Sequence, residues 1–178
     1  MLEMLRKARR ELRFAKDVFG VLRGTKDLTP DSSVTIADEL ERSVDAHADQ
    51  PAFLFEGETT TYRQFDERAN TVANWALSQG LKPGDAVALI LENSPDYLAI
   101  WMGLAKVGVV ASLINTNLEG DGLAHCISIV EAKAIIAGGV QAQRASEVTP
   151  TLSNALPVWD LDGEAGEDLT AALAKQSA

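Results

Sequence analysis

Several residue types that carry common protein chemistry are scarce in this chain of 178 residues. Cys126 is the only cysteine, so an intramolecular disulfide is excluded and a reducing compartment is favoured. The longest apolar runs, such as residues 86–91, fall far short of the roughly 20 residues needed to cross a bilayer. The N-terminus lacks the apolar segment of a signal peptide, so we expect a cytoplasmic protein.

Metal ligands are also few. His47 and His125 are the only histidines, and neither they nor Cys126 have further ligands at metal-binding spacing. We therefore predict no metal site, and we assign no catalytic residue. Aromatic residues make up only 6% of the chain. We expect the three tryptophans to lie in a core or at a subdomain interface rather than in a lipid pocket.

Basic residues are scarce outside the first segment. Residues 1–26 contain eight basic and three acidic side chains, a net charge of +5. The other 152 residues contain eight basic and 23 acidic side chains, which gives −15 and a net charge of −10 for the chain. An acidic body repels nucleic acid, so we expect no nucleic-acid partner. It is also a poor host for ATP or CoA on its own.

What the chain does have begins with a basic amphipathic helix, predicted over residues 1–24. Apolar residues recur at three- and four-residue spacing, and arginines and Lys7 occupy the opposite face. Two interpretations stay open: residues 1–23 bind a membrane surface, or their apolar stripe packs on this protein or on a second copy. A polar segment over residues 25–34, which contains Pro30, is the predicted linker.

The remaining sequence alternates strands and helices. We expect a helix after Thr35, a β-hairpin around Glu56-Gly57-Glu58, and a helix capped by Thr61 and Gln64 that stops at Gly80. Strands apolar on both faces follow, with helices between them. The predicted strands are 86–91, 109–114, 134–137 and 157–161, and the helices start near 95, 123, 141 and 169. This rhythm predicts an α/β fold: a partial doubly wound, mostly parallel sheet with a small N-terminal β-hairpin and a leading amphipathic helix.

Polar residues follow one predicted strand and form the candidate binding site. Asn115, Thr116 and Asn117 come directly after the strand 109–114, and His125 lies early in the next helix. Parallel sheets bind their ligands at the carboxyl ends of the strands, which favours this position. The alternative is that the three residues only form turn and helix-cap hydrogen bonds, and that His125 is a half-buried structural side chain.

Residues 35–137 resemble a known enzyme family through a series of short motifs in a fixed order. The motifs are Thr61-Tyr62-Arg-Gln-Phe65, Gly80-Leu-Lys-Pro-Gly-Asp85, Asn93-Ser-Pro-Asp-Tyr97, Gly103-Leu-Ala-Lys-Val-Gly108, Leu113-Ile-Asn-Thr-Asn-Leu118 and Leu123-Ala-His-Cys-Ile127. This order resembles the AMP-forming, adenylate-forming acyl-CoA synthetases. The last two motifs are similar to the fatty-acid transport protein branch in particular.

The resemblance implies a parent enzyme that activates long- or very-long-chain fatty acids with ATP, Mg and CoA, through an acyl-adenylate. It also implies that residues 35–178 are the N-terminal portion of the large domain. The family's Ser/Thr/Gly-rich phosphate loop and its later motifs are absent from these residues, so we expect the chain alone to be inactive and to bind no cofactor. We further expect a cytoplasmic location, with contact to the inner face of a membrane through residues 1–23, and self-association through a truncated face.

Two rival hypotheses remain. One is another acyl-activating enzyme, specific for aryl or amino acids, which the pattern around Asn115 and His125 disfavours. The other is a free-standing, non-catalytic binding or membrane-adaptor domain derived from the same fold.

Overall fold

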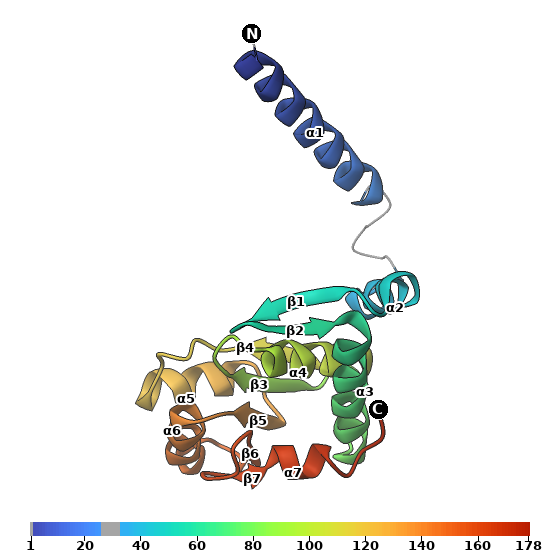
Figure 1. The fold of residues 1–178 in the computed structure, drawn as a ribbon. Coiled ribbons are helices and arrows are strands. Elements are labelled where there is room, and N and C mark those ends of the chain that lie inside the picture. Colours follow the sequence, from blue (N-terminus) through green and yellow to red (C-terminus); the bar gives the residue numbers. More distant parts are fainter. Residues whose placement is uncertain (1, 26–32) are drawn as a thin grey trace. The chain divides into compact units, whose positions relative to one another are not determined.

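The computed structural model describes residues 2–25 and 33–178, and most of the predicted linker (25–34) lies outside them. The chain forms two compact units, Met1–Thr35 and Ile36–Ala178. The first unit contains the helix α1, Leu2–Thr25, which extends one residue past the predicted end. Figure 1 shows the elements of both units. Each unit is described by itself.

The second unit begins with helix α2 (Ile36–His47) and a β-hairpin. Strands β1 (Pro51–Phe55) and β2 (Glu58–Thr61) pair antiparallel, as the turn residues predict. Helix α3 (Tyr62–Ser78) then starts at the predicted capping box, in which the Thr61 hydroxyl accepts from the Gln64 N–H and the Gln64 side chain accepts from the Thr61 N–H. Two otherwise unpaired backbone groups are thereby satisfied, which fixes the start of the helix.

The main sheet is parallel and has five strands in the order β4-β3-β5-β6-β7. The strands are β3 (Ala86–Ile90), β4 (Val110–Leu113), β5 (Ala134–Ala137), β6 (Val158–Asp160) and β7 (Glu167–Asp168). The helices between and after them are α4 (Pro95–Lys106), α5 (Gly120–Ile129), α6 (Val140–Val148) and α7 (Leu169–Leu173). Helix α4 has the predicted Ser94 cap and Pro95 at its first position.

Alternate residues of the central strands enter two different cores. Val87 and Leu89 pack with α3, α4 and α7, whereas Ala88 and Ile90 pack with α5 and α6. Because successive strand side chains point to opposite faces, this division shows helices covering both faces of the sheet. Trp75 and Trp159 meet edge-to-face in the first core, with ring centroids 5.2 Å apart. The predicted α/β, doubly wound fold is confirmed.

Strand β4 differs from its prediction. Residues 109–114 were expected to be buried on both faces, but Val110 and Leu113 are about half exposed. The reason is the position of β4 at the end of the five-strand order, where β3 is its only partner among the described strands. The structure also contains two elements that the sequence pattern did not predict, the two-residue strand β7 and the 3₁₀ turn η1 (Thr149–Thr151).

Candidate functional site

The carboxyl ends of the parallel strands define the first candidate site. Four loops meet at this edge of the sheet, and they follow β3, β4, β5 and β6. From β3 the chain moves outward to β4, then crosses back over β3 to β5 and continues to β6. The loops after β3 and β5 therefore leave the sheet in opposite directions. This is the arrangement in which doubly wound folds open a ligand-binding crevice.

The predicted candidates lie after β4, the strand next to β3. The Asn115 side-chain oxygen accepts from the N–H of Asn117 at 2.9 Å and from its side-chain amide at 3.2 Å. Arg144 of α6 donates to the Thr116 carbonyl at 3.3 Å and pairs with Glu119, also at 3.3 Å. These contacts form the turn and join the loop to α6. They are the hydrogen bonds of the structural alternative, and a ligand role for the three residues stays a prediction.

His125 is separate from these contacts. It is exposed on α5, rather than half-buried as the structural alternative supposed. His47, at the end of α2, is also exposed, with its ring 6.4 Å from that of Tyr62. Within residues 2–25 and 33–178, no three His, Cys, Asp or Glu side chains gather in a way that could hold a metal ion.

The switch point between β3 and β5 is bordered by residues that were not among the predicted candidates. Across it, the Gln141 amide of α6 donates to the Glu92 carboxylate at 3.0 Å, which joins the loops after β5 and β3. A Cβ on Gly138 would lie 2.9 Å from a methyl carbon of Leu91, so the loop after β5 packs closely on the residue that follows β3. The pair Gly138-Gly139 directly after the strand 134–137 was visible in the sequence and could have drawn attention to this loop. The strand order that places this pair at the switch point is not visible in the sequence.

Carboxylates dominate this edge. Asp162 accepts from the Gly139 N–H at 3.0 Å, so it occupies the N-terminus of α6. Asp160 is almost fully buried, and its two oxygens accept from the N–H groups of Asp162, Glu164 and Ala165 at 2.8 to 3.1 Å. A triphosphate placed here would meet these carboxylates and Glu92. The negative charge of these side chains disfavours a polyanion at this edge.

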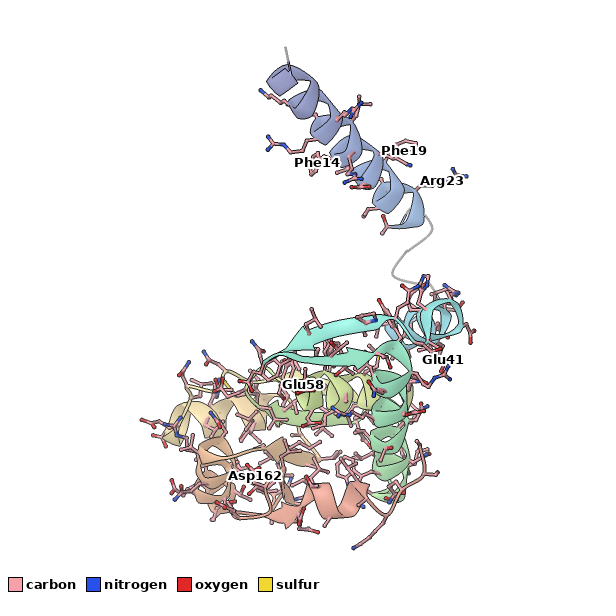
Figure 2. All side chains as sticks on the ribbon, in the orientation of Figure 1. Phe14, Phe19, Arg23, Glu41, Glu58 and Asp162 are labelled. Atoms are coloured by element: carbon pink, nitrogen blue, oxygen red, sulfur yellow. The ribbon has the colours of Figure 1, made fainter. Side chains whose placement is uncertain are left out.

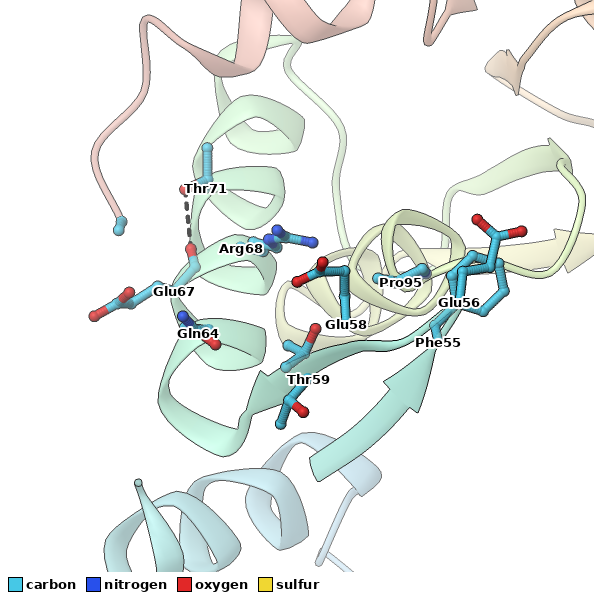
Figure 3. Close-up of a pocket in the computed structure, with 11 residues that line it drawn as sticks. Phe55, Glu56, Glu58, Thr59, Gln64, Glu67, Arg68, Thr71 and Pro95 are labelled. Carbon is cyan, nitrogen blue, oxygen red and sulfur yellow. Dashed lines mark hydrogen bonds between the residues drawn. The ribbon is translucent and has the colours of Figure 1, made fainter. Parts of the chain in front are cut away.

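A second candidate is a hollow of about 540 Å³ between the hairpin and α3 (Figure 3). Its rim carries three carboxylates, Glu56, Glu58 and Glu67, and one guanidinium, Arg68. Arg68 also lines a neighbouring cavity of about 460 Å³, which is lined in addition by apolar residues of α3, α4 and α7. Arg68 pairs with Asp96 at 3.6 Å, and both side chains are about half exposed. The excess of carboxylates disfavours an anionic ligand here too.

A largely buried lysine joins three helices of the second unit. Lys106 of α4 places its Nζ 2.9 Å from Asp66 of α3 and 3.1 Å from Glu41 of α2, and only 9% of its side chain is exposed. Burial alone lowers the pKa of Lys106, but the hydrogen-bonded carboxylates of Asp66 and Glu41 outweigh it. The net result is a pKa raised above the ordinary value of 10.5. Lys106 is thus a structural cation rather than a base.

Fold and motif order together define an adenylate-forming enzyme domain. Residues 40–177 match the family model described as AMP-binding enzyme, and the chain belongs to this family. It is 34% identical over 137 residues to mouse long-chain fatty acid transport protein 6, covering 76% of this chain and 22% of that protein. Rat long-chain fatty acid transport protein 1 is 46% identical over 96 residues, covering 54% of this chain and 15% of that protein.

Solved structures share the fold. The anthranilate CoA ligase AuaEII in complex with anthranoyl-AMP superposes with a TM-score of 0.77 at 21% identity, over 86% of this chain and 30% of that one. The two fatty acid transport proteins are much longer than the present chain, which spans about a fifth of their length. The resemblance to the fatty-acid transport protein branch is confirmed.

Proposed function

We propose that this chain is the N-terminal portion of the large domain of an AMP-forming long-chain acyl-CoA ligase, with residues 35–178 as that portion. The observation that carries the proposal is the family match over residues 40–177, combined with similarity to long-chain fatty acid transport proteins. In the whole enzyme, a fatty-acid carboxylate attacks the α-phosphate of ATP, giving acyl-adenylate and pyrophosphate. The CoA thiol then displaces AMP and forms the thioester.

The acidic strand edge supports an auxiliary role for this chain in that reaction. Asp162 already occupies the N-terminus of α6, and Glu92 and Asp160 add further negative charge. We infer that the groups holding ATP, Mg and CoA come from other parts of the enzyme, and that residues 35–178 form one wall of its large domain. The chain alone is then catalytically silent. Its partner in the enzyme is a fatty acid, and its location is cytoplasmic, with membrane contact through residues 1–23.

The test is adenylate and thioester formation by the full protein encoded with this chain, measured with long-chain fatty acids, benzoate and free amino acids. We expect ATP–pyrophosphate exchange that depends on the long-chain acid, and no exchange from the 178-residue chain alone. A preference for benzoate or an amino acid would transfer the assignment to the aryl- or amino-acid-activating rival. A full gene product without activity towards any carboxylate would favour the non-catalytic binding-domain rival.

A further inference from the structure

The cavity of about 460 Å³ between α3, α4 and α7 has the composition of a small-molecule site. Its volume falls within the roughly 300 to 1,000 Å³ that such sites occupy. Its wall is largely apolar and includes Val72, Ile100 and Leu173, which belong to the core on this side of the sheet or pack against it. A cavity of this kind holds the apolar part of a ligand, and a few polar groups at its rim orient the ligand.

The charge at the rim distinguishes this cavity from the neighbouring hollow beside the hairpin. That hollow has the carboxylates of Glu56, Glu58 and Glu67 against a single guanidinium, and Figure 2 shows Glu58 at the hairpin. The 460 Å³ cavity has one carboxylate, that of Asp96, and one guanidinium, that of Arg68. Asp96 lies in the first turn of the 12-residue helix α4, whose N-terminus adds positive potential at this rim. The rim therefore lacks the excess of carboxylates that disfavours an anion at the hollow.

The guanidinium of Arg68 has hydrogen-bonding capacity to spare. It carries five N–H donors, yet its one partner among the described residues is Asp96, at 3.6 Å, which is longer than a hydrogen bond. Arg63 on the same helix differs, because its Nε and its Nη2 both lie 3.2 Å from Asp49. Both arginine side chains are 53% exposed, so exposure does not explain the difference. A guanidinium with free donors is suited to hold a carboxylate through two parallel hydrogen bonds.

We propose that this cavity binds a small amphiphilic monocarboxylate. The ligand's carboxylate pairs with Arg68 in place of Asp96, and its hydrocarbon chain lies against the apolar wall. The wall near α7 is held in place, since the Asn74 amide of α3 donates to the Ser177 carbonyl at 3.0 Å. The inference rests on the geometry of the second unit and does not depend on the ligase assignment.

The experiment is a titration of the 178-residue chain with octanoate, octan-1-ol and octylammonium, each below its micelle-forming concentration, followed by amide chemical shifts in NMR spectra. The three probes share a hydrocarbon chain and differ in the head group. We expect octanoate to bind roughly 10-fold more tightly than octan-1-ol, because a carboxylate gains charge-assisted hydrogen bonds from Arg68. Octylammonium should bind most weakly, since Arg68 repels it. The largest shifts should occur at Thr71 and Ala174, which line the cavity.

The two members of the ion pair should act in opposite directions. Arg68→Gln removes the donors for the ligand's carboxylate and should lower the affinity for octanoate roughly 10-fold. Asp96→Asn removes the competing carboxylate and should raise that affinity roughly two- to fivefold. Arg63→Gln is the matched control, because Arg63 lies on the same helix with the same exposure and does not line the cavity. It should leave octanoate binding unchanged.

The apolar wall has its own matched pair on α7 and the residue that follows it. Ala174 is exposed and lines the cavity, whereas Ala171 is exposed and does not. Ala174→Phe should weaken the binding of octanoate and octan-1-ol alike, because the added ring competes with their hydrocarbon chains for the cavity. Ala171→Phe should leave both unchanged.

Four outcomes would overturn the proposal. One is absence of octanoate binding to the folded chain. Another is tighter binding of octylammonium than of octanoate, which would make Asp96 the partner of the head group. The third is an equal loss of affinity from Arg68→Gln and Asp96→Asn, which would mean that the ion pair only supports the local structure. The last is binding that Ala174→Phe does not weaken, with shifts at exposed apolar residues such as Leu54 and Ile129, which would mean unspecific adsorption of the hydrocarbon chain.

Discussion

Leu12 and Leu104 are the same residue type in two helices with apolar stripes, yet one is 71% exposed and the other is fully buried. Leu104 belongs to α4, whose apolar side packs between the parallel sheet and α3. Leu12 belongs to α1, whose unit contains no other helix or strand among its described residues. The two regions also differ in charge, since the first segment is basic and the remainder of the chain is acidic. The comparison shows that an apolar stripe predicts a partner but does not identify it.

The sharpest test of this difference uses one glycine from each helix. A Cβ on Gly103 of α4 would lie 2.5 Å from both the carbonyl oxygen of Ala69 and the Cβ of Val72, so the contact between α3 and α4 has no room for it. We expect Gly103→Ala to lower the free energy of unfolding by about 3 kcal/mol, measured by urea denaturation. Gly20 of α1 has open space around its Cβ position.

The control variant is therefore Gly20→Ala. It should raise the helicity of α1, because alanine favours the helix by about 1 kcal/mol over glycine. It should leave the unfolding midpoint of the second unit unchanged. A large loss of stability from Gly20→Ala would show that α1 packs as tightly as α4 does, and the comparison would fail.

Lys106 gives a test of intermediate size. Replacement by methionine keeps most of the packing but leaves Asp66 without the cation 2.9 Å from it, and we expect a loss of about 2 kcal/mol. The raised pKa of Lys106 fixes the sign of the pH dependence. Its stabilising contribution is fully present below the ordinary pKa of 10.5, and is lost as the pH rises through the higher value of the folded state.

Urea titrations of the unmodified chain and Lys106→Met at neutral and strongly alkaline pH check this prediction. The difference between the two should shrink at alkaline pH. A constant difference would mean that Lys106 contributes through packing alone. Lys7 of α1 is the control, because its partner Glu11 is 4.0 Å away and both side chains are largely exposed. Lys7→Met should change stability by less than about 0.5 kcal/mol.

Local chemistry explains which parts of this fold the sequence predicts. The capping box of Thr61 and Gln64, the Ser94 cap and the hairpin turn at Gly57 each involve residues within a few positions of one another. The order of the strands in the sheet depends on residues far apart in the chain, and the sequence analysis did not predict it or the exposure of β4 that follows from it. Val110 and Leu113 have the apolar character of core residues, and only the place of β4 at the end of the order explains their exposure.

The candidate site shows the same limit. Polar residues after a strand drew attention to Asn115, Thr116 and Asn117, whose observed contacts form a turn and join it to α6. The switch point between the β3 and β5 loops instead brings together Glu92 and Gln141, which lie 49 positions apart. Because this juxtaposition depends on β4 and β5 flanking β3 on opposite sides, no local pattern could have predicted it.

A substitution in the edge strand β4 is expected to have the smallest effect on stability. Like α1, this edge exposes a surface that a second copy of the chain could cover. Its outer backbone groups have no partner strand among the described residues, and such edges tend to pair with another chain. We propose that the isolated chain self-associates through β4, and that Val110→Lys reduces this association while changing stability by less than about 0.5 kcal/mol. Light scattering over a concentration series measures the effect.

Val140 of α6 provides the matched control, since it is 51% exposed and Val110 is 52% exposed. Val140→Lys adds the same charge away from the edge and should leave the association unchanged. If both variants dissociate the oligomer equally, net charge rather than strand pairing governs it. If L12S/F19S dissociates it and Val110→Lys does not, the uncovered face of α1 holds the copies together, and self-association belongs to the first unit rather than to the sheet edge.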